Sequence, residues 1–147
     1  MKKNHNYPAT KKICLGFFTA VVIFIVSSCS QKIAFQTSSV VPAARGTVKV
    51  KKDNNQNYTI KIQLTGLAEV KRLQPPKEFY VVWMESGQEP VKNLGQIKSS
   101  SSMLSKTLKA SFESVTPIKP TRIYITAEDY ATAQYPGGMV ILTTDRF

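Results

Sequence analysis

The residues that most enzymes use for nucleophilic and metal chemistry are nearly absent from this chain. Its 147 residues include one histidine, His5, and two cysteines, Cys14 and Cys29. No Gly-x-Ser-x-Gly or Ser-x-x-Lys motif occurs, and no glycine-rich loop is placed to hold a phosphate. The chain therefore has almost no residues that could support Ser-His catalysis, Cys-His catalysis or a histidine-based metal site. We expect no enzymatic activity, no metal site and no cofactor.

Long apolar runs are also scarce. The longest, Ile13 to Val26, has fourteen residues, which is fewer than the roughly 20 that a helix needs to cross a bilayer. Basic residues stand before this run and small residues follow it: Lys2, Lys3, Lys11 and Lys12, then Ser27, Ser28 and Cys29. A basic start, a short apolar segment and small residues before a cysteine are typical of a bacterial lipoprotein signal. A permanent membrane helix is the alternative interpretation.

Cleavage before Cys29 would make this residue the N-terminus and the site of lipidation. His5 and Cys14 would leave with signal residues 1–28, so the mature chain would keep no histidine and no free thiol. It would keep 16 basic and nine acidic residues, a net charge of +7. Residues 30–32 include no aspartate of the kind that retains enterobacterial lipoproteins at the inner membrane. We therefore expect a lipid-anchored protein on the periplasmic face of the outer membrane.

The first half of the mature chain carries a run of basic residues, namely Lys49, Lys51, Lys52, Lys61, Lys71, Arg72 and Lys77. Such a concentration of charge could attract anionic lipid headgroups or polyanionic envelope polymers. Lysines that alternate along a strand are also typical of its solvated face, and they protect an edge strand from aggregation. Nucleic acid is not an expected partner outside the cytoplasm.

Ser30 to Arg45 shows no sustained hydrophobic period and is interrupted by Pro42. With Cys29 it is predicted to form an acylated, flexible tether over residues 29–45, about 20 Å in average span. Its apolar side chains offer an alternative, in which they dock on the following domain; they are Ile33, Phe35, Val40 and Val41.

From Gly46 onward the hydrophobic period is two, which indicates strands with one buried face. Seven segments have this character or a continuous apolar run: 47–51, 59–64, 79–85, 93–97, 107–112, 122–128 and 139–144. No window has a sustained helical stripe. Residues 46–147 are therefore predicted to form one antiparallel β-sandwich, immunoglobulin-like, with about seven strands. Phe79 to Glu85 is apolar on both faces, which predicts a central strand with Trp83 in the core.

Five short motifs stand in an order that resembles a known family: Thr65-Gly66-Leu67, Tyr80-Val81-Val82-Trp83, Asn93-Leu94-Gly95, Thr126-Ala127-Glu128 and Pro136-Gly137-Gly138. They resemble the extracytoplasmic C-terminal domain of anti-sigma-K-type factors. The resemblance implies a β-sandwich that senses or binds an envelope component. The family's helical sigma-binding domain and its zinc site have no counterpart here, and a lipid-anchored chain has no cytoplasmic residues, so no direct contact with a sigma factor is expected.

The best candidates for a binding surface lie around the end of segment 122–128: Tyr124, Glu128, Asp129, Tyr130 and Tyr135. Tyr124 is expected to point away from the core, because Ile123 and Ile125 point inward. Together with the two later tyrosines it could form a surface cluster that recognises an envelope protein or polymer. Tyrosines that only shield the end of the sandwich are the alternative.

Glu128 and Asp129 are the remaining candidates for carboxylate chemistry. Strand alternation points adjacent side chains to opposite sides, so a solvated strand end is the simpler interpretation of this pair. The sequence therefore favours a membrane-anchored, non-enzymatic binding or sensing module. The alternative is a small envelope hydrolase or ligand-binding protein that depends on these carboxylates, with calcium as an option.

Overall fold

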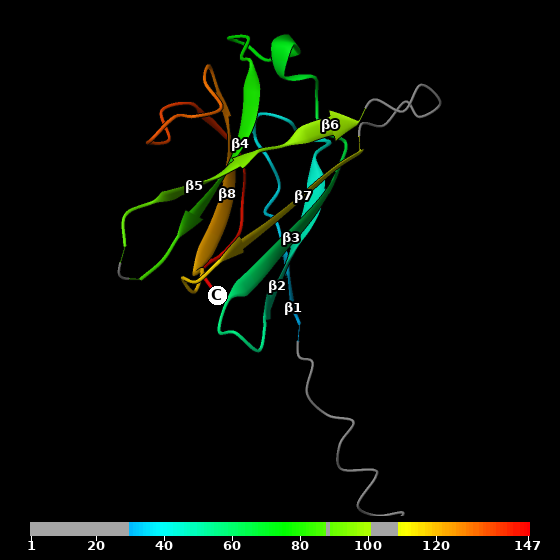
Figure 1. Ribbon diagram of the computed structural model, residues 1–147. Coiled ribbons are helices and arrows are strands. Elements are labelled where there is room, and N and C mark those ends of the chain that lie inside the picture. The colour runs from blue at the N-terminus through cyan, green and yellow to red at the C-terminus, as the bar shows by residue number, and fades with distance from the viewer. Residues whose placement is uncertain (1–29, 88, 101–108) are drawn as a thin grey trace, which may run out of the picture.

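Two antiparallel sheets pack face to face in the computed structural model, which describes residues 30–87, 89–100 and 109–147 (Figure 1). One sheet has the order β1-β2-β3-β7-β6 and the other β5-β4-β8-β9. The strands are β1 (Gln31–Ala34), β2 (Arg45–Lys52), β3 (Tyr58–Thr65), β4 (Phe79–Glu85), β5 (Lys92–Gln96), β6 (Lys98–Ser100), β7 (Lys109–Thr116), β8 (Arg122–Glu128) and β9 (Met139–Thr143). The predicted all-β sandwich is confirmed, with β1 and β6 as additions to the seven expected strands. Residues 107 and 108 of the expected strand 107–112 lie outside the described residues, as do the expected signal 1–28 and Cys29.

Helical structure contributes little to the described part of the chain. Val70–Arg72 forms one turn of 3-10 helix, η2, in the connection between β3 and β4. Within the described ranges, no helix has the length and apolar character needed to cross a membrane.

The β2–β3 hairpin forms as its alternating pattern predicts. Val48, Ile60 and Ile62 are fully buried between the sheets, while the lysines between them point outward. The turn is held by Asp53, whose Oδ1 accepts hydrogen bonds of 2.8 Å from the backbone N–H groups of Asn55 and Asn57. Aspartate is favoured in turns because its side chain can bond the backbone two residues ahead.

β4 lies in the interior of the second sheet, between β5 and β8, and is covered on both faces. Its inward residues are Tyr80, Val82 and Met84, which join the main core. Its outward residues Val81 and Trp83 are also fully buried, in a separate small cluster. The prediction of a central strand with a buried Trp83 is confirmed, although the indole lies on the outer side of the sheet.

The N-terminal segment Ser30 to Arg45 is part of the folded domain, so the predicted flexible tether is wrong. Its first residues form β1, which pairs with β2 through Gln31↔Val50 to Ala34↔Thr47. Phe35 is buried and bridges Thr144, and Gln36 N donates to Thr143 O. The alternative of docking by apolar side chains is the one observed, because both β2 and the end of β9 offer backbone groups for pairing.

The two sheets are joined by continuous chain at both sides. β5 runs into β6 through Ile97, whose N–H still donates to Tyr80 O of the second sheet. On the other side, Phe35 donates its N–H to Gly46 O of the first sheet and bridges Thr144 beyond β9. The segments at Ile97 and Phe35 therefore pair with part of a sheet edge at each side of the sandwich. An unpaired edge strand would be open to pairing with other protein chains.

Candidate functional site

The five predicted surface residues fall into two groups. Tyr124 and Glu128 are buried, with 8% and 5% of their surface exposed. Asp129 is exposed, and Tyr130 and Tyr135 are each 74% exposed. The expected exposure of Tyr124 and the expected solvated position of Glu128 are therefore both wrong, while Tyr130 and Tyr135 do lie at the surface.

The loop between β8 and β9, residues 129–138, explains this burial. It contacts the outward side of the second sheet, where Ala133 packs against the cluster of Val81, Trp83 and Tyr124. Asn93 of β5 fixes the loop, because its side-chain amide donates to Ala131 O at 3.0 Å and to Ala133 O at 2.8 Å. Tyr124 and Glu128, which strand alternation directs away from the main core, are therefore still covered by this loop.

Trp83, Thr126 and Glu128 form a hydrogen-bonded chain under this loop. Trp83 Nε1 donates to Thr126 Oγ1 at 2.7 Å, and Thr126 Oγ1 donates in turn to Glu128 Oε1. The same Glu128 oxygen accepts a 3.0 Å hydrogen bond from the backbone N–H of Gly138. Buried polar groups are stable only when they are paired in this way, and none of the buried side-chain N or O atoms in the described residues lacks a partner. Glu128 therefore ties the end of the loop to β8.

Gly138 passes so close to β8 that no larger residue fits without a shift. A Cβ at this position would lie 1.9 Å from Ala127 O and 2.8 Å from Glu128 Oε2. Gly137, its neighbour, has no atom within 4 Å of an added Cβ. In the Pro136-Gly137-Gly138 motif, the steric requirement for glycine therefore falls on Gly138.

Asp129 points into different surroundings from Glu128. Its Oδ2 accepts a 2.7 Å hydrogen bond from Lys77 Nζ, and its side chain is 56% exposed. The structure thus gives each of the two adjacent carboxylates its own partners. Over the described parts of the chain, no group of three or more His, Cys, Asp or Glu residues is arranged to hold a metal ion.

Two buried tyrosines have raised pKa values. Burial raises the pKa of Tyr80 to about 12, and its hydroxyl donates to Ala68 O at 3.0 Å. Burial is also the main cause of the raised pKa of Tyr124, and the negative charge of Glu85 adds to it. Arg122 acts in the opposite direction on Tyr124. Both hydroxyls are therefore neutral at physiological pH, and that of Tyr80 holds the carbonyl group of Ala68.

The exposed tyrosines lie on the covering loop itself. Tyr130 and Tyr135 stand on either side of Ala133, whose carbonyl is held by Asn93. Val140 of β9 is another large apolar residue left exposed, at 51%. Tyrosine is enriched at protein interfaces because it combines a large rigid area with a hydroxyl group. This loop is the part of the predicted site that can meet a partner.

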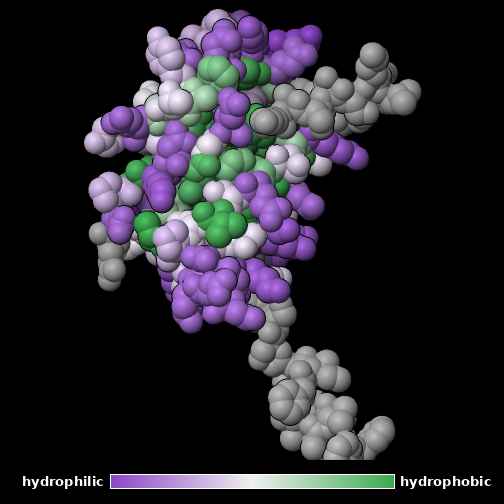
Figure 2. Space-filling view, viewed as in Figure 1, coloured by the Kyte–Doolittle hydropathy of each residue, from purple (hydrophilic) through white to green (hydrophobic). Residues whose placement is uncertain are grey.

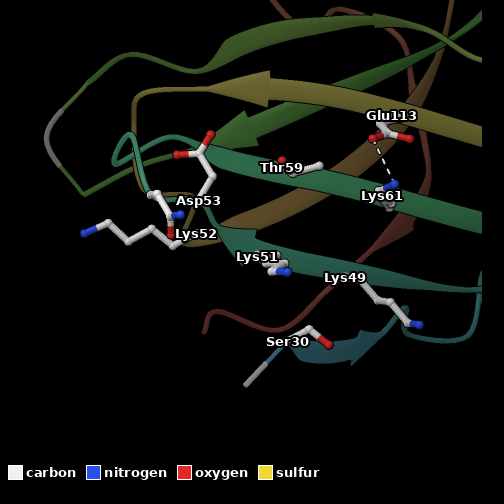
Figure 3. Close-up of a pocket in the computed structure, with 9 residues that line it drawn as sticks. Ser30, Lys49, Lys51, Lys52, Asp53, Thr59, Lys61 and Glu113 are labelled. Atoms are coloured by element: carbon white, nitrogen blue, oxygen red, sulfur yellow. Dashed lines mark ion pairs between the residues drawn. The ribbon is translucent and has the colours of Figure 1, made fainter. Parts of the chain in front are cut away.

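A second surface feature lies on the first sheet. A pocket on its outer face is lined by Ser30, Lys49, Lys51, Lys52, Thr59 and Lys61, with Asp53, Asn54 and Glu113 beside them (Figure 3). Figure 2 shows that hydrophilic side chains also dominate the lower end of the molecule, where the β2–β3 turn lies in Figure 1. The sequence shows the alternating lysines, but it does not show that Ser30 lies among them, because that depends on β1.

Comparisons of the chain with known protein families, with curated proteins and with solved structures found no match. The resemblance to anti-sigma-K-type domains therefore stays a prediction that depends on five short motifs. Three of these motifs supply the hydrogen-bonded chain under the covering loop, through Trp83, Thr126, Glu128 and Gly138.

Proposed function

We propose that this protein is a lipoprotein of the bacterial envelope, acylated on Cys29, whose β-sandwich is a non-enzymatic binding or sensing module. The pattern of basic, apolar and small residues before Cys29 carries the proposed acylation. The structure adds that β1 begins at Gln31, two residues after Cys29. With Phe35 in the core, the domain has no long spacer between its first strand and the proposed lipid. A domain so joined works at a membrane surface, which we propose is the periplasmic face of the outer membrane.

The position of Glu128 supports binding over carboxylate chemistry. A general acid or base must reach the substrate proton directly or through one water. Glu128 is covered by the 129–138 loop, and its Oε1 already accepts hydrogen bonds from Thr126 and Gly138. Asp129 is held by Lys77. Both carboxylates are thus engaged in holding the loop and the strand end.

The proposed partner surface is the covering loop with Tyr130 and Tyr135. Its backbone is fixed at two places, by Asn93 and by the Glu128–Gly138 hydrogen bond. A surface held in place before binding loses less conformational entropy when the partner arrives. The partner is an envelope protein or polymer, as the resemblance to anti-sigma-K-type domains implies.

A photo-crosslinking residue at Thr132 tests this surface in cells, because Thr132 is exposed between the two tyrosines. We expect an adduct that disappears in the Tyr130→Ala/Tyr135→Ala variant, while the melting temperature of the domain stays unchanged. The same crosslinker at Asn55, in the exposed β2–β3 turn, is the control. Equal adducts at both positions, or an adduct that survives loss of both tyrosines, would contradict the proposal.

A further inference from the structure

We propose that the outer face of the first sheet, beside Ser30, docks on anionic phospholipid headgroups of the bilayer that holds the lipid anchor. The inference rests on the proposed acylation of Cys29, and it adds a second membrane contact. It assigns to the lysines around the β2–β3 hairpin the task of setting how the domain lies on the membrane.

The strand register lines up three lysines in one row across the sheet. Lys32 of β1 is paired with Lys49 of β2, and Lys49 is paired with Lys61 of β3. The row ends at Glu113 of β7, opposite Lys61. These residues alternate with the buried Val48 and Ile62, so their side chains share the outer face.

Like charges directly opposite on neighbouring strands destabilise a sheet. Protection of a sheet edge explains lysines only on an outermost strand. Here Lys49 lies on β2, between β1 and β3, and Lys61 lies on β3, between β2 and β7. The like-charge pair Lys49–Lys61 therefore lies on two interior strands, where edge protection does not explain it, and it indicates that an external anion is the intended partner of this face.

The local acidic residues neutralise only part of this positive charge. Glu113 forms one ion pair with Lys61, at 3.0 Å. Asp53 Oδ1 accepts hydrogen bonds from the turn backbone, as described above. Among the described residues, Lys49 and Lys51 have no ion pair, and Lys52 lies 5.8 Å above the ring of Tyr58. The pocket thus holds four lysines and two acidic residues, a net positive charge.

The pocket also lies where the proposed anchor begins. Ser30, the residue after Cys29, lines it together with Lys49 and Lys51 (Figure 3). Consecutive Cα atoms are about 3.8 Å apart, so acyl chains on Cys29 would bring headgroups to the edge of the pocket. Val115, 59% exposed, is in register with Thr59 on the same face and offers an apolar contact. An anionic bilayer is therefore the polyanion that would lie next to these lysines.

The proposal is tested on the mature chain, purified from the cells that process it and added to phosphatidylcholine vesicles with or without phosphatidylglycerol. A membrane-impermeant amine reagent is applied, and each labelled lysine is measured by mass spectrometry. We expect Lys49 and Lys51 to be protected several-fold on the anionic vesicles at low salt, and to lose that protection at high salt. Lys71, 73% exposed in η2, is the internal control and stays equally labelled.

The outcomes separate the docking surface from the anchor. Failure of the chain to bind neutral vesicles would contradict the lipid anchor. Binding to both kinds of vesicle with equal labelling of Lys49 and Lys51 would contradict the docking surface alone. Protection by a soluble polyanion but not by anionic vesicles would also overturn the proposal, in favour of an envelope polymer.

Matched variants of the fragment 30–147, which contains all nine strands, give the second measurement. A lysine close to an anionic surface strengthens membrane binding about five-fold. Lys49→Gln/Lys51→Gln should therefore reduce partitioning onto phosphatidylglycerol vesicles about 25-fold. Lys71→Gln/Arg72→Gln removes the same charge from η2 and should have little effect. Equal losses in the two variants would show that only net charge matters and would overturn a defined docking face.

Discussion

Trp83 and Glu128 are joined through one hydroxyl group, that of Thr126. The indole N–H donates to this hydroxyl at 2.7 Å, and the hydroxyl donates to the buried carboxylate. Glu128 also accepts from Gly138 N–H at 3.0 Å, which closes the 129–138 loop over the indole. The outer side of β4 and β8 is therefore a small second core whose polar members are fully paired. Its integrity decides whether Tyr130 and Tyr135 are held in place.

Glu128→Ala should destabilise the domain by about 2–3 kcal/mol, because it leaves the Gly138 N–H and the Thr126 hydroxyl without their acceptor. Asp129→Asn is the control. It weakens an ion pair whose carboxylate side chain is 56% exposed, so it should cost at most about 1 kcal/mol. Denaturant unfolding measures both. Equal costs would contradict the structural position of Glu128, and a wild-type melting temperature that rises with calcium would point to a metal site.

Trp83→Ala should cost about 3–5 kcal/mol, because it removes a fully buried aromatic side chain. The fragment for this measurement must begin at Ser30, since β1 and Phe35 belong to the fold. Thr126→Val keeps the volume and removes only the hydroxyl that links Trp83 to Glu128, so it should cost less. A loss below about 1 kcal/mol for Trp83→Ala would contradict the second core.

Phe35→Ala should cost about 3 kcal/mol or more, because Phe35 is 8% exposed and packs in the main core. Ala34→Ser is the matched control, since Ala34 is the exposed neighbour on β1. The measurement is equilibrium unfolding of the 30–147 fragment. If Phe35→Ala were as stable as the parent, the segment after Cys29 would be the flexible tether that the sequence predicts.

Tyr80 gives the domain a defined dependence on alkaline pH. In the unfolded chain its proton leaves near the ordinary pKa of 10.0, whereas burial keeps it bound in the folded state up to about pH 12. Between these values the unfolded state binds fewer protons than the folded state. The contribution of Tyr80 to the free energy of unfolding is therefore fully present below pH 10 and is lost as the pH rises to 12. Tyr80→Phe, unfolded over the same pH series, should show a smaller fall. Identical slopes for the two proteins would contradict this assignment.

The strands were largely predictable from the sequence because their hydrophobic pattern is local. Val48 with Val50, Ile60 with Ile62, and Ile123 with Ile125 each show the period of two that a half-buried strand requires. β1 was missed because four residues are too few to show a period, and because its place depends on backbone groups of β2. The burial of Phe35 depends equally on the far end of the chain, at Thr144.

The candidate site was predictable only in part, for a related reason. Alternation correctly directs Tyr124 and Glu128 away from the main core, and the exposed Tyr130 and Tyr135 follow from their loop position. Alternation does not tell whether an outward residue meets water. Here the 129–138 loop covers both outward side chains. The loop is held by the side chain of Asn93, which is distant from β8 in sequence, and by the backbone N–H of Gly138, which lies outside the hydrogen-bond ladder of β8. The closest signal in the sequence was the Gly137-Gly138 pair.

Metabolic labelling with a fatty-acid probe tests the central proposal, a lipid-anchored binding module, most directly. The wild-type chain should incorporate the probe, and Cys29→Ala should not, because its only acylation site is gone and the signal stays attached. Cys14→Ala, which changes the chain's other cysteine, should be labelled like the wild type. Undiminished labelling of Cys29→Ala, or loss of labelling in Cys14→Ala instead, would contradict the anchor and with it the membrane location of the domain.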